Sequence, residues 1–267
     1  VERVHLSAIK RFPGVHWKSP RLIVYGETGR YPLFVVIHTN CIKFRLRLTQ
    51  MDGNRYPKKV YNMLLSIQSQ NYTTWACKVR NVLYKYGFGE VWETQGVGDI
   101  STFLREFRQR LVNCFRQDWH SSLESHVFYN VYSLFKQSLC MSSYLYQIRN
   151  VHLRRMLARF RFGMSPLNNH YLQYKPNVNN VDNLCPLCSD DTLETEVHFL
   201  LVCPAYNEIR VELIASKYYR NPSMFRMCQL LPSTNVQVVR QLATYIYTAL
   251  RFRTDSLENA QLQDVGP

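Results

Sequence analysis

The sequence predicts a mainly α-helical protein, in which a basic helical region is followed by a small zinc-stabilised segment and by C-terminal helices. Apolar residues recur at intervals of three and four along most of the chain, which is the period of an amphipathic helix. No alternating series is long enough to build a sheet, although residues 196–201 could pair briefly as a strand. Residues 185–203 carry a compact Cys/His pattern of the form C-x2-C-x9-H-x4-C, which is typical of zinc segments.

The first third of the chain predicts short helices around one loop. The expected elements are helices over residues 4–9, 41–51, 57–67 and 75–86, with a loop at residues 11–32. That loop contains three Pro and three Gly residues, which interrupt regular secondary structure. Pro57 can open its helix because the first turn does not need the missing N–H group. Gly87 and Gly89 stop the fourth helix.

A long helix is expected after Asp99, whose side chain is a candidate N-cap. Its apolar face carries Phe103, Leu104, Phe107, Leu111, Phe115 and Trp119. Further helices are expected over residues 129–135 and 148–164, two or three more after the cysteine cluster, and one that opens at Ser233 and runs through Ala249. This pattern divides the chain into a helical region (1–148), the basic helix with the Cys/His segment and C-terminal helices (149–253), and a polar, frayed tail (254–267).

The charge of the chain is unevenly distributed. Its 267 residues are 46% hydrophobic, which is enough for a sizeable core and excludes wholesale disorder. The chain has 33 Lys and Arg against 19 Asp and Glu, a net charge of +14. Residues 1–184 hold 26 of the basic and 10 of the acidic residues (+16), and residues 185–267 hold 7 and 9 (−2). We therefore expect the first two-thirds of the chain to bind a polyanion, and nucleic acid rather than a membrane surface.

The chain shows no targeting or disulfide signature. No apolar run approaches the roughly 20 residues of a membrane helix, and the opening VERVHLSAIKRF mixes charged and apolar residues from the start. Because it begins with Val, we expect it to be a piece of a longer protein. Four isolated cysteines are expected to be small core residues, which indicates a reducing compartment: Cys41, Cys77, Cys114 and Cys140.

Four residues are candidate ligands of one structural Zn²⁺ ion per chain: Cys185, Cys188, His198 and Cys203. The C-x2-C turn brings two thiolates to one side, and His198 and Cys203 can face the same point from a helical or tight turn. Three thiolates and one imidazole would close the coordination sphere, so the site should not be catalytic. Alternatives are two unrelated cysteine pairs beside a core histidine, or substitution of a ligand by His170 or Cys228.

The second candidate site is basic. Residues 149–161, RNVHLRRMLARFR, contain no acid, and on a helix their apolar residues form one stripe. The candidate nucleic-acid contacts are Arg149, Arg154, Arg155, Arg159 and Arg161, with Lys58 and Lys59 as an upstream pair. Arginine at such positions suits phosphate contacts, which set affinity rather than sequence choice. The alternative is a solvated helix face.

The motifs of the chain resemble the region downstream of the reverse transcriptase core in non-LTR (LINE-type) retrotransposon polyproteins. The zinc segment of that family is similar to LCPLCSDDTLETEVHFLLVCPAYNEIR, and the basic helix that leads into it is similar to RNVHLRRMLARFRFGMSPLNNHYL. The stretch that links the polymerase thumb to the zinc segment resembles KRFPGVHWKSPRLIVYGETGRYPL, NRYPKKVYNMLL and YGFGEVWETQGVGD. The resemblance covers residues 1 to about 253.

This resemblance implies a nucleic-acid-binding accessory region that helps to hold template RNA or target DNA. The parent would be an RNA-directed DNA polymerase in the nucleus, and its upstream polymerase domain would be a partner. By matching motif, the resemblance also gives the ligand role to the four Cys/His residues. No catalytic residue, membrane association or small-molecule substrate is expected here, since the chain has no glycine-rich phosphate loop, G-x-S-x-G or H-E-x-x-H motif.

Two other functions remain open from the sequence. A protein-interaction module could use the acidic zinc loop, with Asp190, Asp191, Glu194 and Glu196, to dock a basic partner. A metal-dependent nuclease could use Glu90, Glu93 and Asp99. The pair Asp190-Asp191 is not expected to be a polymerase metal pair, because it lies within the zinc loop rather than on a hairpin between apolar strands.

Overall fold

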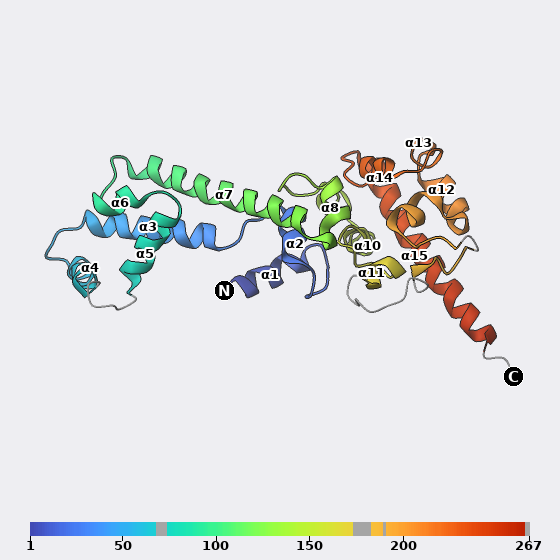
Figure 1. Ribbon diagram of the computed structural model, residues 1–267, viewed down its shortest axis with the longest axis horizontal. Coiled ribbons are helices and arrows are strands. Elements are labelled where there is room, and N and C mark those ends of the chain that lie inside the picture. The colour runs from blue at the N-terminus through green and yellow to red at the C-terminus, as the bar shows by residue number, and fades with distance from the viewer. Residues whose placement is uncertain (68–73, 173–182, 189–190, 265–267) are drawn as a thin grey trace. The chain divides into compact units, whose positions relative to one another are not determined.

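The computed structural model describes residues 1–67, 74–172, 183–188 and 191–264, and it confirms the mainly α class (Figure 1). The β-pairing within these residues consists of two isolated bridges, Thr28 with Met141 and Leu184 with Leu193. The brief strand expected at residues 196–201 is wrong, because these residues lie in helical turns. No helix in the described part of the chain combines the length and the hydropathy that crossing a membrane requires.

The chain divides into two compact units. Unit 1 comprises residues 1–2 and 31–120, and unit 2 comprises residues 3–30 and 121–267. The boundary expected at residue 148 lies inside unit 2.

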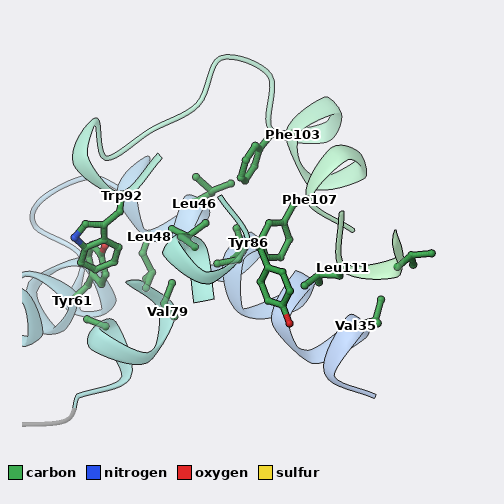
Figure 2. Packing of buried hydrophobic residues seen from close by; sticks show 14 residues of the cluster. Val35, Leu46, Leu48, Tyr61, Val79, Tyr86, Trp92, Phe103, Phe107 and Leu111 are labelled. Carbon is green, nitrogen blue, oxygen red and sulfur yellow. The ribbon is translucent and has the colours of Figure 1, made fainter. Parts of the chain in front are cut away.

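Unit 1 is built around one apolar cluster. Its helices are α3 (Phe34–Thr49), α4 (Tyr56–Ile67), α5 (Trp75–Lys85), α6 (Gly89–Glu93) and the first part of α7 (Ile100–Ser125). Helix α3 packs against α4 and α5, and α5 packs against α6. Asp99 caps α7 as predicted, since its Oδ2 accepts a hydrogen bond from the N–H of Thr102 at 2.6 Å. Figure 2 shows the predicted stripe of α7, with Phe103, Phe107 and Leu111, among the core residues.

Unit 2 is organised by helix α15 (Val236–Asp264), which packs against three other helices: α9 (Tyr144–Gln147), α10 (Val151–Arg161) and α12 (Asn207–Leu213). The remaining elements of this unit are α1 (Glu2–Arg11, from its second residue), α2 (Arg21–Thr28), η2 (Val127–Tyr129), α8 (Asn130–Phe135), α11 (Asn168–Leu172), η4 (His198–Val202), η5 (Pro204–Tyr206), α13 (Ser216–Tyr219) and α14 (Met224–Leu230). Asn150 caps α10, because its Oδ1 accepts from the N–H groups of His152 and Leu153.

Two expectations about unit 2 are corrected. Residues 21–28, expected within a loop, form α2 between Pro20 and Gly29, which is the left-handed C-cap with φ +64°. Most of this helix is buried, and it is short and contains Gly26 between the flanking Pro20 and Gly29, so the sequence favours a loop there. The tail expected to fray after Thr254 instead continues α15 to Asp264, since residues 255–264 contain neither Gly nor Pro.

Candidate metal centre

The four predicted ligand residues come together in unit 2. One ligand atom from each of them lies within 4.8 Å of every other: Cys185, Cys188, His198 and Cys203. Cys185 Sγ lies 3.7 Å from Cys203 Sγ, and Cys188 Sγ lies 3.3 Å from His198 Nε2. Cys185, His198 and Cys203 are buried, and Cys188 is half-buried. The cluster could hold a metal ion.

A short hairpin positions the two N-terminal ligands. Leu184 and Leu193 form an antiparallel bridge, and two backbone bonds of 2.8 Å run from Cys185 N to Thr192 O and from Glu194 N to Asn183 O. These bonds close the loop that contains the C-x2-C turn, so both thiols face the same side. The connection needs an unusual backbone conformation at Asp191, whose φ is +46°.

A π-helical turn, η4, positions the other two ligands. The N–H of Cys203 donates to the carbonyl of His198 at 2.8 Å, an i→i+5 bond that brings residues five apart over one another. In an ordinary α-helix, residues five apart point in different directions. The x4 spacing between His198 and Cys203 therefore matches the geometry of this turn.

Side chains from neighbouring helices satisfy the backbone carbonyls around η4. Arg210 of α12 donates to Leu200 O at 2.9 Å and to Cys203 O at 2.7 Å. Tyr245 of α15 donates to Phe199 O at 2.7 Å. Buried carbonyl groups need such partners, so the two helices fix the position of the turn.

Two acidic residues of the segment, Glu194 and Glu196, are buried and serve as internal anchors. The carboxylate of Glu194 is fully buried and accepts from Arg253 Nε at 2.6 Å and from Asn168 N at 2.7 Å. Glu196 pairs with His170 Nε2 at 3.0 Å. His170 and Cys228, considered as substitute ligands, lie outside the cluster. Asp190 lies outside the described residues, and Asp191 is exposed.

Burial raises the pKa of the Cys185 and Cys203 thiols. The same groups are therefore neutral thiols at neutral pH when no cation lies among them. A bound cation stabilises the thiolate and releases the proton.

The predicted arginines on and beside α10 have different environments. Arg149, Arg155 and Arg159 are exposed, and none of them forms an ion pair with a carboxylate within the described chain. The stem of Arg155 crosses Gly14, where a Cβ atom would lie only 2.3 Å from Arg155 Cγ. Arg154 is half-buried and donates to Ile148 O at 3.2 Å.

The environment of Arg161 contradicts the prediction that this residue contacts nucleic acid. It is buried, and its guanidinium forms a bidentate ion pair with Glu27 of α2, with N–O distances of 3.0 and 2.8 Å. The guanidinium also lies over the rings of Phe135 and Tyr144. A cation held in this way is structural and is not available to a phosphate. The sequence contains no local sign of this pair, since its members are 134 positions apart.

The upstream pair belongs to unit 1. Lys58 is half-buried and donates to Thr49 O at 3.1 Å, and Lys59 is exposed. Their amines lie over the rings of Tyr61 and Tyr56, respectively. These lysines belong to unit 1, and the arginines of α10 belong to unit 2.

The other sequence candidates do not form a second cluster. In the described ranges, the Cys/His group is the one set of three or more ligand-type side chains that could hold a metal ion, and Glu90, Glu93 and Asp99 do not make another. The isolated cysteines expected in the core are not fully buried: Cys41, Cys77 and Cys114 are half-buried, and Cys140 is exposed.

Comparison of the chain with protein-family models, with curated proteins and with solved structures finds no match.

Proposed function

We propose that this chain is a nucleic-acid-binding region in which a structural zinc ion supports a basic helical scaffold. The observation that carries the proposal is the set of exposed arginines on and beside α10, Arg149, Arg155 and Arg159, which have no carboxylate partner in the described structure. The family resemblance refines this role to an accessory region of a non-LTR retrotransposon reverse transcriptase, with no active site of its own, that holds template RNA or target DNA beside its polymerase domain.

The ligand geometry supports zinc. Bonds of about 2.3 Å to sulfur and 2.0 Å to nitrogen in a tetrahedron give edges of about 3.8 Å between sulfurs and 3.5 Å between sulfur and nitrogen. Two of the distances here are 3.7 Å, between Cys185 Sγ and Cys203 Sγ, and 3.3 Å, between Cys188 Sγ and His198 Nε2, and all four ligand atoms lie within 4.8 Å of one another. Four side-chain ligands would fill the coordination sphere. The ion would then contribute folding energy and would leave no position for a substrate.

The metal segment is packed against the basic helix. Phe199 of η4 lies 5.6 Å from Phe160 of α10, measured between ring centroids, and its ring also contacts Tyr206 and Tyr245. Ordering of η4 by a bound ion would therefore hold the buried face of α10 in place. The exposed face of the same helix carries Arg155 and Arg159.

Removal of Arg149, Arg155 and Arg159 together is expected to weaken duplex binding and to flatten its salt dependence. Each phosphate contact releases counterions, so the slope of log affinity against log salt should decrease by roughly two to three units. The loss should be similar for unrelated sequences, because these contacts position rather than specify. Fluorescence anisotropy with duplex DNA and with RNA, at several salt concentrations, measures both effects.

The matched control removes the same charge elsewhere in unit 2, at Arg220, Arg240 and Arg251, which are also exposed. This variant should retain most of the wild-type slope. Equal slopes for the two triple variants would mean that α10 is only a solvated face. If the wild-type chain binds neither duplex DNA nor RNA at low salt, the proposed function is excluded.

A further inference from the structure

Unit 1 contains an apolar groove to which neither the metal-ligand cluster nor the arginines of α10 contribute. It has a volume of 540 Å³ and is lined by α3, α4 and the start of α5. The lining residues are Phe44, Leu48, Tyr56, Pro57, Val60, Tyr61, Leu64 and Trp75. Four of these eight side chains are aromatic. Two of the aromatic rings are open to solvent, since Tyr56 is 83% exposed and Phe44 is 48% exposed.

Cations lie directly against this aromatic surface. The amine of Lys59 lies 6.0 Å from the ring centroid of Tyr56, and the amine of Lys58 lies 5.8 Å from that of Tyr61. Residues 34–67 carry six Lys and Arg residues against one acid, Asp52. An apolar groove whose flanking charges are nearly all positive complements a ligand with flat apolar faces and a negatively charged backbone.

A buried cation behind the groove adds to the positive electrostatic potential of this surface. Arg45 is fully buried, and its Nε donates to Tyr61 Oη at 3.3 Å, while its guanidinium stacks on Trp92 at 4.9 Å. No carboxylate pairs with it in the described chain, and its Nη1 has no hydrogen-bond partner there. Arg45 therefore contacts both Tyr61 and Trp92, which are labelled in Figure 2. An uncompensated buried charge is costly, and a nearby polyanion would offset it.

We infer that this groove binds unpaired bases of single-stranded RNA or DNA. The bases would stack on Tyr56 and Phe44, and the lysines would contact the adjacent phosphates. A duplex cannot use this surface in the same way, because its bases are already stacked on one another. The inference rests on the proposed function and extends it: α10 would contact the backbone of a duplex, and the groove would hold a single strand.

Tyr56 gives the sharpest test, because its exposed ring can be changed with little effect on folding. Tyr56→Ala in the full chain should weaken binding of an oligothymidine of about ten nucleotides by about tenfold, and Tyr56→Phe should bind as wild type. Tyr56→Leu should behave like Tyr56→Ala, because leucine restores apolar area without a ring on which a base can stack. Anisotropy of the labelled oligonucleotide gives the affinities, and circular dichroism checks the fold.

Two controls make the outcomes distinct. Tyr146→Ala removes a tyrosine of unit 2 that is 60% exposed, and it should bind the oligonucleotide as wild type. Duplex affinity of the Tyr56 variants should be unchanged. The inference is overturned if wild type binds no single strand at low salt or if Tyr56→Ala binds it as tightly as wild type. Full restoration by Tyr56→Leu also overturns it, because the contact would then need apolar area and not a ring on which a base stacks. Retained duplex binding in any of these cases leaves the proposed function standing.

Discussion

The Cys188→Ser variant is expected to lose its metal ion and, with it, the order of residues 184–188 and 191–210. A serine hydroxyl is a poor replacement for a thiolate, and three remaining ligands cannot close a structural site. Binding energies of about 10 kcal/mol or more couple such ions to folding, so the effect should exceed that of an ordinary core substitution. Elemental analysis should give one zinc per wild-type chain after repletion and almost none for the variant. Hydrogen exchange should increase first around η4.

Cys228→Ser is the matched control for this experiment, since Cys228 is another half-buried cysteine of unit 2 but lies outside the cluster. It should retain one zinc ion per chain and the wild-type exchange pattern. Chelation of the wild-type protein should reproduce the Cys188→Ser pattern. An unchanged zinc content in Cys188→Ser would contradict the ligand assignment.

The Arg161→Met variant is expected to lose about 3–5 kcal/mol of unfolding free energy in unit 2. The substitution leaves the carboxylate of Glu27 buried without its bidentate partner. A second substitution, Glu27→Leu, should recover part of the loss, because it removes the unpaired charge. Hydrogen exchange of peptides from α10 and α15 follows the stability of this unit by itself. Arg159→Met, an exposed neighbour on the same helix, should have almost no effect.

The same pair predicts a dependence on pH. Burial alone would raise the pKa of Glu27, but the charge and hydrogen bonds of Arg161 lower it below its usual value of 4.5. The stability that this carboxylate contributes is therefore present in full above pH 4.5 and is lost as the pH falls through its lowered pKa. The difference in stability between wild type and Arg161→Met should shrink in that acidic range. A difference that stays constant down to acid unfolding would show that the pair is not ionic.

The sequence predicts those parts of the structure that depend on local patterns. The apolar stripe of α7, its Asp99 cap and the four Cys/His residues could all be found from spacing alone, because each involves residues that are close along the chain. The ion pair of Glu27 with Arg161 could not, since it depends on a tertiary contact. Helix α2 is hidden in the sequence because it has only eight residues, includes Gly26 and lies between Pro20 and Gly29, all of which favour a loop.

The burial of Arg45 shows another limit of sequence interpretation. Arg45 is one of six Lys and Arg residues in the segment 34–67, but it lies in the core of unit 1 against Trp92. Arg45 follows buried Ile42 by three positions and precedes buried Leu48 by three, which places it on the apolar face of α3, whereas Arg47 lies on the exposed face. The residue type alone is therefore misleading, because an arginine on an apolar face can be buried.

The central position of α15 has a consequence for the order of events during synthesis. Phe160 and the ligands of the metal site are translated well before Tyr245, which follows Phe160 by 85 residues. At roughly 5 to 20 residues per second, the ribosome takes several seconds to deliver the helix that covers them. During that interval the apolar side of α10 has no partner from α15 and is open to chaperones or to aggregation. Truncated mRNAs that end before the codons of α15 should therefore yield insoluble protein, even though every metal ligand has already been translated.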